Sequence, residues 1–161
     1  MNAANKDDQI HVEPKGEREL VTTRTFNAPP RIVFKTWSEP DLFKQWWVPK
    51  SMGMVLLSCD MDIRVGGKYR LEFKHPQGGD QPIAFFGQYK EVTPPKKLVW
   101  TNEESPDSPL TTVTFEDKGE KTFLTLHELY PSKEARDNAF QDMPEGMGET
   151  FDQLDAFLLT M

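Results

Sequence analysis

The sequence predicts an α+β fold: a curved antiparallel sheet of about six to seven strands wraps around a long C-terminal helix, and two short helices follow the first strand. Three patterns lead to this prediction. Residues 54–129 divide into short apolar runs separated by Gly- and Pro-containing turns, as in a strand meander. Two proline-initiated segments of helical spacing lie between residues 29 and 49. An apolar stripe of period three to four occupies the C-terminal end.

The N-terminal residues 1–17 are expected to form a disordered leader, because they lack periodicity and contain Pro14 and Gly16 among polar residues. Residues 18–161 are expected to form a single domain, since no internal repeat or linker divides them. The run Glu19–Phe26 is rich in β-branched residues and predicts the first strand.

Two short helices are predicted after this strand. Pro29-Pro30 opens the first helix, because proline is tolerated in a first turn. The second is expected to begin at Pro40 and to end at Pro49, with Trp46 and Trp47 on it. Since adjacent helix positions face different directions, we expect one of these tryptophans to pack in the core and the other to line an edge or the surface.

The remaining strands are predicted from alternation and turn residues. In Lys68–Lys74, the apolar Tyr69, Leu71 and Phe73 alternate with charged residues, which predicts one dry and one solvent-facing side of the sheet. Gly66-Gly67 predicts a tight turn before this strand. The predicted strands of this region span residues 54–63, 68–74, 85–92, 98–101, 110–116 and 122–129.

The last segment is predicted to be helical. Ser132 can cap a short helix through Phe140, and Pro144 predicts a kink or a restart. The stripe beyond it has spacings of four, three, four and three, and we expect it to cover the dry face of the sheet. The residues of this stripe are Met147, Phe151, Leu154, Leu158 and Met161.

Composition excludes several classes of protein. The formal charge of −7 and the pI near 5.0 argue against a general nucleic-acid-binding surface. No apolar run approaches the roughly 20 residues that span a bilayer. Cys59 is the single cysteine, so no intrachain disulfide can form, which fits a reducing compartment. We therefore expect a cytoplasmic protein, and its eleven Phe and four Trp predict an aromatic core.

Five segments resemble motifs of the Aha-type family, the homologues of the activator of the heat-shock chaperone ATPase. They occur in the family's order, and the resemblance covers Glu19 to Leu159. It implies the helix-grip fold of the START-like (SRPBCC) superfamily, which includes the birch-pollen allergen, lipid carriers and aromatic polyketide cyclases. The five segments are Glu39–Pro49 with its Trp-Trp-Val-Pro sequence, Asp62–Tyr69, Pro95–Thr101, Val113–Glu116 and Thr122–Glu128.

One position departs from the family pattern. Family members usually carry Gly-Trp at the start of the last helix, and this sequence has Gly146-Met147. Methionine is flexible and fills irregular gaps, so the contact between helix and sheet can persist while the shape of a pocket changes.

Residues that could carry catalysis or bind a metal are few. His11, His75 and His127 are the only histidines, and no His or Cys pair has ligand spacing, so we expect neither a metal nor another cofactor. No Gly-x-Ser-x-Gly elbow occurs. Asp62 and Arg64 are interpreted as an ion pair beside the glycine turn. An acid–base role for Glu128 or Asp62 remains an open alternative.

The favoured function is non-catalytic binding of a hydrophobic small molecule, as a carrier or sensor, in a cavity between the sheet and the C-terminal helix. Two alternatives stay open: a stress protein whose partner is a heat-shock chaperone, and a cyclase- or hydrolase-like enzyme using the same cavity. The candidate lining residues are Trp37, Trp46, Tyr69, Leu71, Phe73, Phe85, Tyr89, Trp100, Phe115, Met143, Met147, Phe151 and Leu154.

Overall fold

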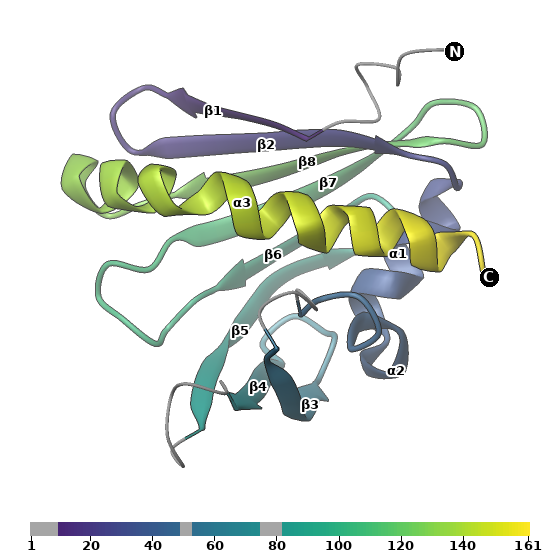
Figure 1. Ribbon diagram of the computed structural model, residues 1–161, viewed down its shortest axis with the longest axis horizontal. Coiled ribbons are helices and arrows are strands. Elements are labelled where there is room, and N and C mark those ends of the chain that lie inside the picture. Colours follow the sequence, from purple (N-terminus) through teal and green to yellow (C-terminus); the bar gives the residue numbers. More distant parts are fainter. Residues whose placement is uncertain (1–9, 49–52, 75–81) are drawn as a thin grey trace.

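The computed structural model describes residues 10–48, 53–74 and 82–161, the side chains of 142–147 excepted. It has the predicted α+β architecture, with one large sheet, a helical segment after the second strand and a long C-terminal helix (Figure 1). The elements are β1 (His11–Lys15), β2 (Glu19–Phe26), α1 (Pro30–Ser38), α2 (Pro40–Phe43), β3 (Val55–Met61), β4 (Lys68–Lys74), β5 (Ile83–Thr93), β6 (Lys97–Thr101), β7 (Leu110–Asp117), β8 (Thr122–Leu129) and α3 (Lys133–Leu158).

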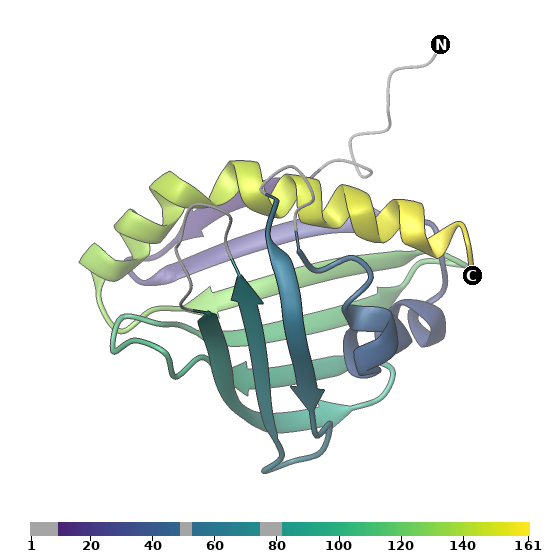
Figure 2. The same ribbon diagram turned by 60° about the horizontal axis from the view of Figure 1, so that its bottom comes forward.

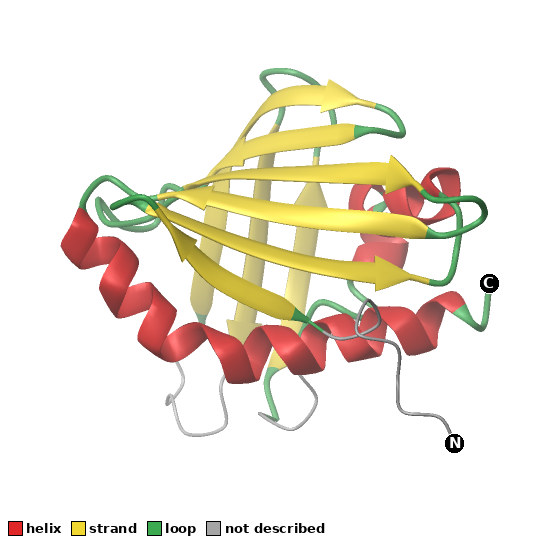
Figure 3. Cartoon of the chain, turned by 90° about the horizontal axis from the view of Figure 1, so that it is seen from above, coloured by secondary structure: helices red, strands yellow, loops and turns green. Residues whose placement is uncertain are grey.

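The eight strands form one antiparallel sheet in the order β1-β2-β8-β7-β6-β5-β4-β3. The helical segment α1–α2 carries the chain from β2 to the far edge, and the meander β3–β8 then returns to β2. The sheet bends so strongly that β3 and β4 run across the direction of β2 and β8 (Figure 2). Its open side is spanned by α3 (Figure 3).

The sheet has one strand more than the six to seven predicted, because residues 11–15 form β1 and pair with β2. The expectation of disorder is therefore wrong for these residues. Val12 and Pro14 gave no strand pattern, and Gly16, with φ of 58°, makes the turn into β2. An edge strand needs only one row of ladder hydrogen bonds, which is why it tolerates a proline.

The second helix is shorter than predicted. α2 ends at Phe43, and Trp46 and Trp47 lie in the turn that follows it. Trp46 is fully buried, and its indole Nε1 donates to the carbonyl oxygen of Thr36 at 2.9 Å. A buried indole N–H needs such an acceptor. Tertiary packing of this ring therefore overrides the helical spacing of the sequence.

The C-terminal segment is a single helix, so the restart considered at Pro144 does not occur. The axis of α3 bends near its middle, in agreement with the alternative of a kink (Figure 3). Ser132 caps the helix as predicted, since its side chain accepts a hydrogen bond from the Ala135 amide at 3.1 Å. A proline removes one helical hydrogen bond, and packing on both halves of α3 offsets that loss.

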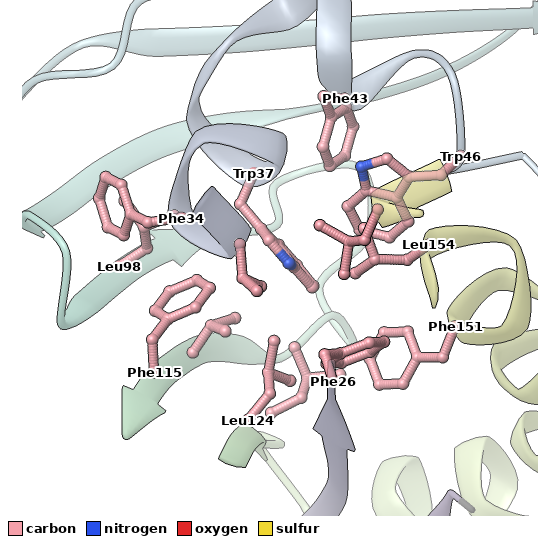
Figure 4. Close-up of a cluster of buried hydrophobic side chains, with 14 of the residues drawn as sticks. Phe26, Phe34, Trp37, Phe43, Trp46, Leu98, Phe115, Leu124, Phe151 and Leu154 are labelled. Atoms are coloured by element: carbon pink, nitrogen blue, oxygen red, sulfur yellow. The ribbon is translucent and has the colours of Figure 1, made fainter. Parts of the chain in front are cut away.

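The core is a cluster of aromatic and aliphatic side chains centred on Trp37 (Figure 4). The Trp37 ring lies 4.8 Å from that of Trp46, 6.1 Å from that of Phe115 and 6.2 Å from that of Phe151, measured between ring centroids. These rings come from α1, the turn after α2, β7 and α3. The cluster therefore joins both helical segments to the concave face of the sheet.

An ion-pair network fixes α3 against β2. Nη1 of Arg24 lies 2.6 Å from Oδ1 of Asp152, and Nη2 lies 3.6 Å from Oδ2 of Asp155. The Arg24 side chain is only 5% exposed and stacks over the ring of Phe26 at 5.2 Å. Breaking a pair in which one partner is buried leaves an uncompensated charge, so this contact should be sensitive to substitution.

We expect Arg24→Ala to lower the free energy of unfolding by about 3 kcal/mol, because Asp155 would keep a half-buried carboxylate without its cation. Urea denaturation measures the change. The matched control is Arg31→Ala on the exposed face of α1, which should stay within about 0.5 kcal/mol of the wild type. Equal losses in the two variants would contradict this role for Arg24.

Candidate functional site

A cavity of about 250 Å³ lies between the concave face of strands β4–β8 and the segment that contains α1 and α2. Its walls are mostly aromatic and aliphatic, and polar side chains come from β7, β8 and the connection between β6 and β7. The described lining residues are Trp37, Phe43, Trp47, Met61, Tyr69, Leu71, Phe85, Tyr89, Trp100, Asn102, Glu104, Pro109, Thr111, Leu126 and Glu128.

The predicted lining residues fall into three groups. Six lie in the cavity wall: Trp37, Tyr69, Leu71, Phe85, Tyr89 and Trp100. Five pack in the core instead: Trp46, Phe73, Phe115, Phe151 and Leu154. Two, Met143 and Met147, have side chains outside the described part of the chain, so the consequence of methionine at the family's usual tryptophan position stays a prediction. Contact of any of these residues with a ligand is likewise still a prediction.

The wall opposite the sheet differs from the expected one. Among the side chains that the structure describes, it is formed by Trp37, Phe43 and Trp47, and none of α3 takes part. Phe151 of α3 closes on Phe26, with ring centroids 5.5 Å apart. Phe151, Leu154 and Leu158 of the α3 stripe are buried in the core cluster. The Trp47 ring stacks on Phe43 at 4.7 Å, which agrees with the prediction that one of the adjacent tryptophans packs in the core and the other at an edge.

A cross-strand row brings the polar and aromatic lining residues together. Tyr89 pairs with Trp100, Trp100 with Thr111, and Thr111 with Glu128 in the strand register. Directly opposite residues share one face of the sheet, with Cβ atoms about 5 Å apart. Glu128 is therefore placed on the cavity side by the register itself.

Hydrogen bonds occupy most of the polar groups next to this row. The Tyr69 hydroxyl donates to the carbonyl oxygen of Thr101 at 2.7 Å and lies 3.1 Å from Oδ1 of Asn102. Nδ2 of Asn102 donates to Oγ1 of Thr111 and to the carbonyl oxygen of Pro109, both at 2.8 Å. Burial raises the pKa of both Tyr69 and Tyr89, so their hydroxyls remain protonated.

Glu128 is the exception to this satisfied network. Its Oε1 is buried and has no hydrogen-bond partner among the described residues. Burial raises the pKa of Glu128 to about 7, and the nearby Tyr130 hydroxyl opposes this with a smaller effect. The carboxyl group therefore titrates near neutral pH.

Reasoning from the sequence named Glu128 only as an open acid–base alternative and did not place Glu128, Asn102 or Thr111 in the cavity wall, although a signal for Glu128 was present. Leu124 and Leu126 share its parity on β8 and point into the core, so the period of two places Glu128 on the same face. Asn102 lies beyond the end of β6, where no periodicity applies, and Thr111 looks like an ordinary strand residue.

Other reactive residues lie outside the cavity. His127 points to the opposite face of β8, where its Nε2 lies 2.6 Å from Oε1 of Glu19. Burial raises the pKa of the Cys59 thiol to about 11, which makes it a poor nucleophile. The ion pair predicted between Asp62 and Arg64 is confirmed, with 2.8 Å between Oδ2 and Nε.

Within residues 10–48, 53–74 and 82–161, no group of three or more His, Cys, Asp or Glu side chains could hold a metal ion. None of the helices in the same part of the chain is both long enough and apolar enough to cross a membrane.

The raised pKa of Glu128 predicts a pH-dependent stability. The folded state holds the proton up to a pH of about 7, whereas the unfolded chain releases it near pH 4.5. Stability should therefore fall as the pH rises between these values, by at most about 3 kcal/mol. Glu128→Gln should match the wild type at pH 5 and exceed it at pH 8, as measured by urea denaturation at both values.

The control for this experiment is Glu116→Gln, which changes an exposed glutamate on β7. Its stability should follow that of the wild type at both pH values. If the stability of Glu128→Gln also equals that of the wild type at pH 8, burial of the ionised Glu128 carboxylate does not destabilise the folded state.

Comparison with known proteins agrees with this architecture. The sequence profile of the family described as "Activator of Hsp90 ATPase homolog 1-like protein" matches residues 27–158. A crystal structure of a protein from Rhodobacter sphaeroides superposes with a TM-score of 0.86 at 23% identity, covering 95% of this chain and 99% of that one. A comparison with proteins of curated function found no match.

Two further solved structures show the same fold. A protein from Nitrosomonas europaea gives a TM-score of 0.80 at 25% identity, covering 92% of this chain and 99% of that one. A protein from Mycobacterium smegmatis gives 0.79 at 22% identity, covering 94% and 98%. Since the family profile matches most of the chain, the protein belongs to the Activator of Hsp90 ATPase homolog 1-like family and has its START-like fold.

Proposed function

We propose that this protein binds a small hydrophobic molecule in the cavity between β4–β8 and the α1–α2 segment, as a carrier or sensor. The observation that carries the proposal is the cavity of about 250 Å³ with its aromatic walls. Ligand sites are usually concave and apolar with a few polar groups, and this cavity has that composition. Membership of a START-like family, whose fold commonly binds hydrophobic ligands, supports the same function.

The dimensions of the cavity limit the ligand. A volume of about 250 Å³ is slightly below the roughly 300–1,000 Å³ that is usual for ligand pockets. It corresponds to about eight water molecules at about 30 Å³ each. A fused pair of aromatic rings with a short polar chain is therefore a suitable size, and a whole phospholipid is too large.

An acid–base enzyme using the same cavity is the second candidate, and Glu128 is the observation that favours it. A carboxyl group with a pKa of about 7 in a cavity has the property expected of a general acid or base. The described lining residues include no His, Lys or Cys, and Glu104 is their one other carboxyl group. Loss of turnover in Glu128→Gln, in a screen of ester and cyclisation substrates, would support the enzyme.

A chaperone partner is suggested by the name of the family alone. Stimulation of a heat-shock ATPase by the purified protein measures it directly, and no change in turnover at saturating protein would exclude it.

We expect Leu71→Phe to weaken binding of 2-(1-naphthyl)ethanol at least tenfold. The added ring volume enters the cavity, because Leu71 is a buried residue of its wall. Isothermal titration calorimetry measures the affinity. Thermal denaturation supplies a second readout, since a ligand at a hundredfold excess over Kd adds about 2.7 kcal/mol of stability to the protein that binds it.

Leu57→Phe is the matched control, because it makes the same change at a β3 residue that is 53% exposed. This variant should bind as the wild type does. The proposal fails if a panel of naphthyl alcohols, amines and acids leaves the melting temperature of the wild type unchanged, or if the two Leu→Phe variants lose the same affinity.

A further inference from the structure

We propose that the ligand of this cavity carries a basic amino group, which binds as an ammonium ion against the carboxylate of Glu128 and the surrounding aromatic rings. The inference rests on the proposed function, since it names the chemical class of the molecule bound in the same cavity. Three properties of the described lining residues carry it: their unused hydrogen-bonding capacity, their charge and their aromatic faces.

At the polar end, the buried polar atom left without a partner among the described residues is an acceptor. The Tyr69 hydroxyl and the Asn102 amide beside the cross-strand row are already bonded to carbonyl and hydroxyl oxygens. Oε1 of Glu128 is buried and accepts no hydrogen bond from any described residue. In its ionised form this carboxyl group can only accept, so a ligand that donates a hydrogen bond satisfies the oxygen, whereas a ligand that only accepts leaves it unpaired.

One unpartnered donor also belongs to a lining residue. Nε1 of Trp37 is buried without a hydrogen-bond partner among the described residues. Figure 4 shows this atom within the apolar cluster of the core. Burying this neutral N–H group without a partner costs far less than burying a carboxylate. The need of Glu128 for a hydrogen-bond donor therefore decides the chemistry of the ligand.

The charge of the cavity wall favours a cation. Its described residues include the carboxyl groups of Glu104 and Glu128 and no Lys, Arg or His. Arg136 of α3 is held by the carbonyl oxygens of Gly16 and Glu19. In Glu104, Oε2 accepts a hydrogen bond from the Phe86 amide at 3.2 Å. Glu128, whose Oε1 is buried without a partner among the described residues, is the carboxyl group that we assign to the ammonium ion.

The described groups that titrate or carry charge near Glu128 are few. They are Tyr130 directly after β8, Glu104 from the connection between β6 and β7, Tyr69 on β4, Tyr89 on β5, Arg24 on β2 and Arg136 on α3. The tyrosines stay neutral, and Arg24 is paired with Asp152 and Asp155.

Aromatic faces complete the arrangement. Trp100 lies two positions from Glu128 in the cross-strand row, and its ring is 6.3 Å from that of Tyr89 and 6.1 Å from that of Trp37. The electron-rich faces of Trp and Tyr attract cations as well as apolar rings. The same wall therefore suits both the ring and the ammonium group of an aryl-alkyl amine.

Binding of an ammonium ion requires Glu128 in its charged form. In the empty cavity this carboxyl group is about one-tenth ionised at pH 6 and about nine-tenths ionised at pH 8, given its pKa of about 7. The affinity for an amine that stays protonated throughout should rise about tenfold between these pH values. A neutral ligand of the same shape should show no such rise.

The experiment compares the amine 2-(1-naphthyl)ethylamine, the alcohol 2-(1-naphthyl)ethanol and the carboxylate 1-naphthaleneacetate. Their binding to the full chain is measured by calorimetry at pH 6 and pH 8. We expect the amine to bind most tightly and its affinity to rise about tenfold with pH. In Glu128→Gln, the affinity for the amine at pH 8 should fall at least tenfold and lose its pH dependence, while the alcohol should bind within about threefold of the wild type. Glu116→Gln, on the exposed surface of β7, should behave as the wild type.

The outcomes separate this inference from the proposed function. Equal, pH-independent binding of the amine and the alcohol by the wild type would overturn the inference and leave cavity binding intact. Two other results would also overturn it: weaker binding of the amine at pH 8 than at pH 6, and a preference of Glu128→Gln for the amine over the alcohol as large as that of the wild type. If none of the three compounds binds the wild type, the proposed function falls together with the inference.

Discussion

The burial of the Trp37 indole is the interaction on which the rest of this structure depends. One face of its helix brings the ring against Trp46, Phe115 and Phe151, so a single side chain holds the turn after α2, the sheet and α3 together. Protein cores are close-packed, and displacing this ring would disturb every layer. The same ring also forms part of the cavity wall, so solid core and open space meet at Trp37.

The position of the cavity is set by two helical elements, α3 and the α1–α2 segment, that cover unequal parts of the concave face of the sheet. α3 closes over β2, where Arg24 pairs with Asp152 and Asp155, and its apolar side chains Phe151 and Leu154 are fully buried. The α1–α2 segment covers the other part of the concave face with fewer residues. A strongly curved sheet has more dry surface than one helix and one short segment can fill, and the remaining volume faces β4–β8.

Glu128 is the residue at which the local rules of folding fail. Its strand neighbours Leu124 and Leu126 are buried apolar residues, and a leucine in its place would satisfy the pattern of β8. A carboxyl group there has a buried oxygen without a partner among the described residues and a pKa of about 7. Departures of this kind are expected where a protein sacrifices stability for a function, and this one lies in the cavity.

The sequence by itself determined the α+β class, seven of the eight strands and the cap at Ser132, because these depend on periodicity and local chemistry. Six of the side chains proposed for a binding site line the described cavity, and their contact with a ligand stays a prediction. It did not predict β1, whose pairing with β2 supplies what Val12 and Pro14 lack. Only the tertiary structure decided that Phe151 and Leu154 of α3 pack in the core and that Glu128 lies in one cross-strand row with Thr111 and Trp100. Periodicity predicts which side of a strand faces the core. Strand register decides which core-facing residues of neighbouring strands lie side by side, and the packing of α3 and the α1–α2 segment on the sheet decides where a cavity remains.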